Sequence, residues 1–278
     1  MADAVVEERP KAKRGRPTKR SRIVDRVTQY AHDVIDGRLI AGPHVRAACR
    51  RHLQDLQDAP ARGFVWDVQA AADRIAFFEE VLRLNGGQFE GRPFLLLGWQ
   101  AFVVGSIEGW RRADTSTRRF RVVYVETGKG SGKSPLAAGV GLAGLTVDGE
   151  ARAEIYAAAT KKDQAMVLFR DAVAMFRQSP ELLKRLTPSG VGESVWNLGY
   201  RATGSFFRAI SADDGQSGPR PHVALIDEVH EHKTGNVVEM MRAGTKSRRQ
   251  ALIFMITNSG AGKKTRSEEH TSELQSRL

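Results

Sequence analysis

The chain has little cysteine and no long apolar run, and each absence excludes a class of protein. Its 278 residues include one cysteine, Cys49, so no disulfide forms within the chain. This fits a reducing compartment. No run approaches the roughly 18 uninterrupted apolar residues of a membrane span. The basic, polar N-terminus also lacks the apolar core of a signal peptide. We therefore expect an intracellular protein without a membrane anchor.

Acidic residues are also few relative to basic ones. The sequence has 43 lysines and arginines but 32 aspartates and glutamates, for a formal charge of +11. Such an excess favours polyanionic partners, because binding releases counterions. Residues 1–22 lack apolar periodicity, and we interpret them as a disordered basic tail. Within it, Arg14-Gly15-Arg16-Pro17 matches the core of an AT-hook, but the match is short and a generic solvated tail is the favoured interpretation.

The spacing of apolar residues divides the rest of the chain. Residues 23–115 carry four stretches with helical spacing, at 23–34, 45–56, 71–82 and 99–110. From residue 116 to 264, short β-rich runs at 120–125, 154–158, 223–226 and 251–257 alternate with helical stretches, and 195–198 with 205–210 suits a hairpin. This alternation predicts a mainly parallel central sheet flanked by helices, an α/β fold preceded by an N-terminal helical segment.

A glycine-rich loop follows the first of these strands. Its sequence, 126–134, is ETGKGSGKS, and a helical stretch opens at its end. That context is required of a Walker A phosphate loop, in which backbone amides and a helix N-terminus surround phosphate oxygens. Thr127 stands where the standard pattern has its first glycine. The candidate binding residues are Gly128, Lys129, Gly130, Ser131, Gly132, Lys133 and Ser134.

Two carboxylates end the apolar run at 223–226. Ligands of parallel sheets bind at the carboxyl ends of strands, so Asp227 is a candidate Mg²⁺ ligand together with the Ser134 hydroxyl. Glu228 is the candidate base for the attacking water, and Lys133 is expected to neutralise the β- and γ-phosphates. Asp227 lies 94 positions after Lys133, which leaves room for an intervening strand. Together the two motifs predict a P-loop NTPase that uses ATP and Mg²⁺.

Weaker signals lie around these motifs. Thr257 and Asn258 end the last strand, where they suit either a γ-phosphate sensor or a plain turn. The Gln100 amide suits recognition of adenine or simple solvation. Lys129 points either to the γ-phosphate or to solvent. His230 and His232 lack further ligands nearby and are not expected to hold a metal.

Several separated segments resemble tailed-phage terminase large subunits. Residues 94–100 (FLLLGWQ) look like that family's adenine-binding stretch, and Asp227-Glu228-Val229-His230 looks like its Walker B region. Segments 30–53 and 158–165 and the pair Thr257-Asn258 resemble its N-terminal helices, the region after its second strand and its coupling motif. The match runs from about Tyr30 to Gly260 in the expected order.

The resemblance implies a function and partners. It implies an ATP-hydrolysing motor that moves double-stranded DNA into a procapsid, with Gln100 contacting adenine. It also implies a ring of subunits at the portal in the host cytoplasm, with a portal protein and a small terminase subunit as partners. The family carries a C-terminal nuclease, but residues 265–278 are polar and resemble translated sequencing adapter, so we expect a truncated chain without nuclease activity.

Two alternatives stay open from the sequence. One keeps the fold but assigns a helicase-like, DNA-stimulated ATPase. The other is an inactive, truncated DNA-binding fragment whose basic tail does the binding.

The basic tail generates a first prediction. Deleting residues 1–22 removes eight lysines and arginines, at positions 9, 11, 13, 14, 16, 19, 20 and 22. Affinity for duplex DNA and the slope of its salt dependence should both fall, because fewer counterions are released. Titration of labelled DNA at several salt concentrations measures both quantities. An unchanged slope would show that the tail makes no phosphate contacts.

Overall fold

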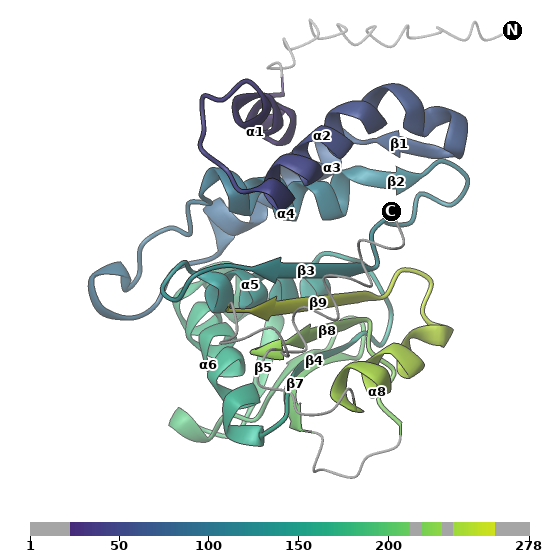
Figure 1. The fold of residues 1–278 in the computed structure, drawn as a ribbon. Coiled ribbons are helices and arrows are strands. Elements are labelled where there is room, and N and C mark those ends of the chain that lie inside the picture. Colours follow the sequence, from purple (N-terminus) through teal and green to yellow (C-terminus); the bar gives the residue numbers. More distant parts are fainter. Residues whose placement is uncertain (1–22, 212–217, 230–235, 259–278) are drawn as a thin grey trace, which may run out of the picture.

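A computed structural model describes residues 23–211, 218–229 and 236–258 of the chain. A helical N-terminal segment lies beside one edge of a large sheet, and further helices cover the faces of that sheet (Figure 1). The sheet is mainly parallel, so the α/β class expected from the sequence is confirmed. None of the helices in these ranges is both long and apolar enough to cross a bilayer.

Four helices build the N-terminal segment: α1 (Arg26–Ile35), α2 (Pro43–Asp58), α3 (Val68–Ala76) and α4 (Gly98–Gly109). Local signals fix their starts. The Asp25 carboxylate caps α1 by accepting from the Thr28 amide at 3.0 Å, and Asp67 caps α3 in the same way. Pro43 occupies the first turn of α2, where its missing N–H costs nothing. A π-helical turn, Phe77–Val81, extends α3.

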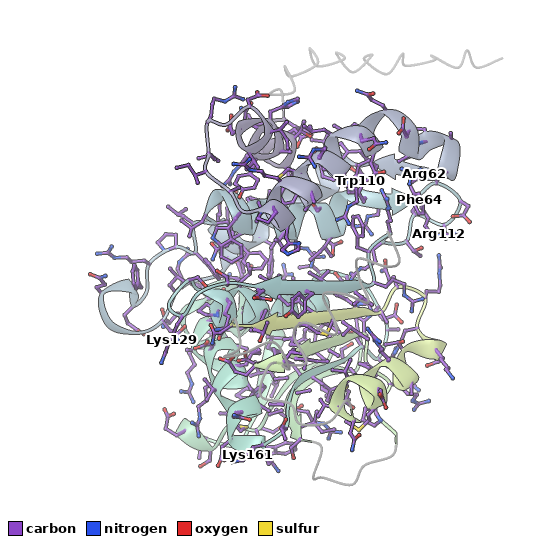
Figure 2. The ribbon with its side chains drawn as sticks, in the orientation of Figure 1. Arg62, Phe64, Trp110, Arg112, Lys129 and Lys161 are labelled. Atoms are coloured by element: carbon purple, nitrogen blue, oxygen red, sulfur yellow. The ribbon has the colours of Figure 1, made fainter. Side chains whose placement is uncertain are left out.

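The segment is not purely helical, which corrects the sequence analysis. Strands β1 (Phe64–Trp66) and β2 (Trp110–Arg112) form a small antiparallel sheet, in which β1 follows the short 3-10 helix η1 (Ala59–Arg62) and β2 follows α4 (Figure 2). Three-residue strands are too short to show period-two alternation. On α2 the buried face also differs, because Asp55 is buried where the apolar pattern favoured Leu56. Arg62 and Arg119 neutralise the Asp55 carboxylate, so burial is possible there.

The central sheet has the strand order β3-β9-β8-β4-β7-β6-β5. Its parallel strands are β3 (Val122–Glu126), β9 (Leu252–Thr257), β8 (Val223–Ile226), β4 (Glu154–Ala159) and β7 (Ser205–Ser211). The expected hairpin is present as β6 (Asn197–Tyr200) against β7, and a further strand, β5 (Leu186–Ser189), extends it. Because the first five strands are parallel, their carboxyl ends meet at one edge.

Helices α5 (Lys133–Thr146) and α6 (Lys162–Gln178) cover one face of the sheet, and α8 (Asn236–Gly244) covers the other (Figure 1). The short α7 (Pro180–Arg185) follows α6. On β8 the side chains alternate between the two faces: Leu225 belongs to the α5 core and Ile226 to the α8 core. Strand β8 is therefore buried on both sides, as its continuous apolar sequence predicts.

Two glycines let α5 lie close to both of its neighbours. A Cβ at Gly139 would overlap the ring of Phe78 in the N-terminal segment. A Cβ at Gly141 would lie 2.7 Å from the Leu225 side chain on β8. Helix α5 is thus packed between the N-terminal segment and the sheet, which fixes the position of its first residue, Lys133.

A buried histidine in the N-terminal segment is held neutral. The Trp110 indole N–H donates to His52 Nδ1 at 3.0 Å, so Nδ1 carries no proton. His52 Nε2 lies 2.9 Å from the Thr28 hydroxyl. Burial lowers the pKa of His52 to about 4. The folded protein therefore excludes a proton that the unfolded chain binds near pH 6.5.

This difference predicts a loss of stability in mild acid. As the pH falls from about 6.5 toward 4, His52 binds a proton in the unfolded state but not in the folded state. The free energy of unfolding should therefore fall by roughly 2 kcal/mol between pH 7 and pH 5. Urea unfolding at both pH values should show this loss in the natural protein. The non-titrating His52→Gln variant should lose less over the same interval. Equal losses would mean that His52 is charged in the folded state.

Candidate functional site

The glycine-rich loop joins β3 to α5 at the carboxyl edge of the sheet. Gly130 and Gly132 have φ angles of +78° and +81°, a left-handed conformation that favours glycine. Gly132 is the N-cap of α5, and no side chain caps the helix, so its first amides remain open to an anion. Thr127 has no positive φ, and its amide donates to the Thr257 carbonyl at 3.2 Å. A side chain is therefore tolerated where the standard motif has glycine.

Two residues of the loop differ in their surroundings. The Ser131 hydroxyl is buried and has no hydrogen-bond partner within the described ranges. A buried hydroxyl without a partner is available to form a hydrogen bond with a bound ligand. Lys129 is exposed and lies at the margin of the molecule beyond β3 (Figure 2). Within the described ranges no hydrogen bond or ion pair joins Lys129 to Asp227 or Glu228.

Lys133, Asn258 and Glu228 meet through their side chains. The Lys133 ammonium donates to Asn258 Oδ1 at 2.8 Å and lies 3.7 Å from Glu228 Oε1. The Asn258 amide donates to both Glu228 oxygens, at 3.2 and 3.1 Å. Lys133 is 7% exposed, so its charge is compensated inside the protein. The loop lysine and the candidate base are thus one hydrogen-bonded group.

The strand order explains this meeting. Strand β9 lies between β3 and β8, with Glu126 beside Thr257 and Ile226 beside Met255. Asn258 follows β9 directly, so it emerges between the loop after β3 and the carboxylates after β8. The gap between Lys133 and Asp227 in the sequence holds strands β4 to β7 ahead of β8, whereas β9, which lies between the two motifs in space, follows both of them in the sequence.

Asp227 is a buried carboxylate with a raised pKa. Burial, followed by the charge of Glu228, raises the pKa of Asp227 to about 6, while Lys133 opposes this shift. One oxygen of Asp227 accepts from the Glu228 amide at 2.7 Å. Glu228 has a φ of +48°, which is rare for a residue with a side chain and accompanies many functional sites. A bound cation would stabilise the ionised form of Asp227.

The donor set fits a magnesium ion shared with a nucleotide. Ser134, in the first turn of α5, and Asp227, which follows β8, both offer hard oxygen atoms of the kind that Mg²⁺ prefers. The described residues contain no group of three or more His, Cys, Asp or Glu that would cage a metal alone. A site with few protein ligands is expected where phosphate oxygens complete the coordination.

Gln100 lies against the loop. It is 3% exposed and stands in the first turn of α4, where Oε1 accepts from the Leu97 amide at 2.9 Å. Its Nε2 lies 3.2 Å from the point where a Cβ on Gly132 would stand. Within the described ranges Nε2 has no hydrogen-bond partner. The structure therefore places the proposed adenine-contacting amide next to the proposed phosphate loop, although 32 positions separate Gln100 from Gly132 in the sequence.

The sequence analysis missed one charged neighbour of the site. Asp171, on α6, adds negative charge that raises the pKa of Asp227. Burial raises the pKa of Asp171 itself, and the Asn85 amide donates to it at 3.1 Å. No local sequence signal marks Asp171, because its proximity to Asp227 arises from the packing of α6 on the sheet.

Comparisons with known proteins identify the family of the chain. Residues 98–275 match the family model of the terminase large subunit ATPase domain. The chain belongs to this family. A comparison with curated proteins gave no match.

The terminase fold is also found among solved structures. The large terminase of bacteriophage HK97 matches with a TM-score of 0.62 at 19% identity, over 74% of this chain and 42% of that one. The ATPase domain of the Thermus phage P74-26 large terminase gives a TM-score of 0.41 at 21% identity, over 51% of this chain and 61% of that one. The chain therefore spans less than half of the HK97 protein that it resembles in fold.

Family membership supports nucleotide binding by this terminase ATPase domain, and hydrolysis of ATP as its activity. Three parts of the sequence analysis lie outside the described residues: the basic tail with its AT-hook match, the pair His230 and His232, and the segment 259–278.

The loop geometry predicts that alanine substitutions at two of its glycines differ in their effect on stability. Gly132→Ala should lower the free energy of unfolding by about 1–2 kcal/mol, because a side chain is strained at φ +81°. Its Cβ would also press on the Gln100 amide. Gly128→Ala is the matched control: its φ is not positive and its Cβ would meet nothing within 4 Å, so a change under about 0.5 kcal/mol is expected. Urea unfolding without nucleotide measures both changes in the free energy of unfolding. Equal changes in the two variants would contradict the left-handed conformation assigned to Gly132.

Proposed function

We propose that this terminase ATPase domain hydrolyses ATP with Mg²⁺ and, in the assembled terminase, drives double-stranded DNA into a procapsid. The observation that carries the proposal is the group formed by Lys133, Asn258 and Glu228 beside an uncapped helix N-terminus. A phosphate-binding cation and a carboxylate base adjoin each other there, as hydrolysis of a phosphoanhydride requires.

Each side chain has a proposed role in hydrolysis. The amides of Gly128 to Gly132 and the Ser131 hydroxyl bind phosphate oxygens, and Lys133 neutralises the β- and γ-phosphates. Ser134 and Asp227 hold Mg²⁺, which supplies neutralisation of the phosphate charge. Glu228 orients the attacking water and accepts its proton. Thr257 and Asn258 report the state of the γ-phosphate, since Asn258 already contacts both Lys133 and Glu228.

Recognition of the base is proposed for Gln100. Its free Nε2 donates to an acceptor on adenine while Oε1 remains on the Leu97 amide. Lys129 is exposed, so we assign it contact with phosphate oxygens only on their solvent side.

The partners follow from family membership and charge. The formal charge of +11 suits DNA phosphates, held without reading of sequence. We further propose a ring of subunits at the procapsid portal in the host cytoplasm, with portal protein and small terminase subunit bound. Stimulation of ATP turnover by portal-bearing procapsids and DNA is the experiment that tests this role. Turnover coupled instead to duplex unwinding would identify a helicase-like ATPase.

Two substitutions separate binding from hydrolysis. Lys133→Ala should abolish turnover by removing the phosphate-binding charge. Glu228→Gln should lower turnover by about 10²- to 10⁴-fold, the contribution of a positioned base, while ATP binding is retained. Phosphate release and binding of a fluorescent ATP analogue measure the two effects.

Matched controls exist on α7. Lys184 and Glu181 form an exposed ion pair there, at 3.1 Å. Lys184→Ala and Glu181→Gln make the same chemical changes outside the site and should leave turnover unchanged. Natural turnover in Lys133→Ala or Glu228→Gln would overturn the assignment of these roles.

A further inference from the structure

A buried cluster of charges lies where the N-terminal segment meets the ATPase core. The Asp148 carboxylate accepts from Arg74 and Arg118, both at 2.5 Å, and lies 2.7 Å from His222 Nε2. Glu108 adds a second carboxylate, 3.4 Å from Arg74 and 3.3 Å from Arg118. The side chains of these residues are at most 9% exposed. None of them belongs to the nucleotide site proposed above.

The cluster joins the far ends of three elements whose other ends carry the candidate site. Helix α4 has Gln100 in its first turn and Glu108 in its last. Helix α5 begins at Lys133, and Asp148 follows its end. His222 precedes β8, and Asp227 follows it. One set of ion pairs and hydrogen bonds therefore links α4, the end of α5 and the start of β8 to one another at the end opposite the candidate site.

Geometry makes the far ends important. Helix α4 has 12 residues, so it is about 18 Å long at 1.5 Å per residue. Gln100 lies eight residues from Glu108, or about 12 Å, so a tilt of about 5° around the cluster would move it by about 1 Å, which is enough to misalign a hydrogen bond. Gln100 must reach a base whose phosphates are held on α5, so the relation between these two helices decides whether both contacts form together.

The chemistry of the cluster suits such a task. Burial alone would raise the pKa of Asp148, but the guanidinium groups of Arg118 and Arg74 hold it well below its usual range. The carboxylate is therefore ionised and has several fixed, directional partners. Buried ion pairs contribute little net stability compared with apolar packing, but they do favour one arrangement over others.

We propose that Glu108 and Asp148 are positioning residues that hold the adenine-binding end of α4 in register with the phosphate loop. They act through Arg74 and Arg118 and touch no substrate. The inference rests on the proposed function in one respect, namely that Gln100 contacts the base of the nucleotide. It assigns specificity for adenine to a cluster at the opposite end of the fold.

The test compares two buried carboxylates of equal exposure. Glu108→Gln keeps the shape of the side chain but weakens the link between α4 and the cluster. Asp55→Asn is the matched control, because the Asp55 side chain is also 4% exposed and also pairs with arginines, Arg62 and Arg119, where Glu108 pairs with Arg74, Arg111 and Arg118. Asp55 lies on α2, and its ion-pair partners lie outside α4, α5 and β8. Both variants lose a buried ion pair, so both should unfold at lower temperature.

Nucleotide selectivity should separate the two variants. In Glu108→Gln the preference for ATP over GTP, measured as the ratio of their Kd values with Mg²⁺, should fall about tenfold, the size expected when one hydrogen bond to the base is lost. Asp55→Asn should keep the natural ratio. Hydrogen exchange without nucleotide should likewise rise at residues 98–104 in Glu108→Gln only.

The outcomes distinguish the two ideas. Equal Kd ratios and equal exchange in both folded variants would overturn the positioning role and leave the ATPase assignment intact. A natural protein that binds neither nucleotide would overturn the proposed function, and the exchange measurement would still decide whether the cluster holds α4 in place. If Glu108→Gln fails to fold, Arg74→Lys replaces it, since it keeps the charge but offers fewer donors to Asp148 and Glu108.

Discussion

A buried ammonium group at the carboxyl edge of the sheet is the constraint on which the candidate site depends. Lys133 has little contact with solvent, and an isolated charge there would be costly. Asn258 supplies a hydrogen bond and Glu228 a negative charge, so the cation is stable before any phosphate arrives. Asp227 sits on the same side, where burial and the charge of Glu228 raise its pKa. The arrangement is the one that our proposal requires, with a cation for the phosphates and a carboxylate for Mg²⁺.

The parts of this site that the sequence predicted are those that local chain geometry determines. A strand, a glycine-rich loop and a helix follow one another between 122 and 146, so the positions of Lys133 and Ser134 depend on neighbours in the sequence. Asp227 and Glu228 end a strand that is buried on both faces, which places them at the ligand-binding edge of a parallel sheet. The departure at Thr127 had no structural consequence, because the backbone there does not take the left-handed conformation of Gly130 and Gly132.

Other features depend on contacts between residues that are far apart in the sequence, and no local sequence pattern predicts them. Asn258 contacts Lys133, 125 positions earlier in the sequence, only because β9 lies between β3 and β8. The spacing of apolar residues does not predict that strand order. Asp55 is buried because arginines from two other segments neutralise it. Strands β1 and β2 are too short for a periodic signal, and α8 escaped notice although its apolar residues cover a face of the sheet. In each case the position of the residue or segment depends on the part of the chain that packs against it, rather than on its own local sequence.

Helix α5 connects these local and distant features. An amphipathic surface helix would expose one side to water, but α5 is buried along its length from Leu136 to Thr146. Its glycines admit the Phe78 ring on one side and the β8 side chains on the other, so the helix has little freedom to shift or rotate. A phosphate loop attached to such a helix inherits its fixed position. Because Asp148 anchors the other end among buried arginines, the loop is positioned by packing along the helix and by ion pairs beyond it.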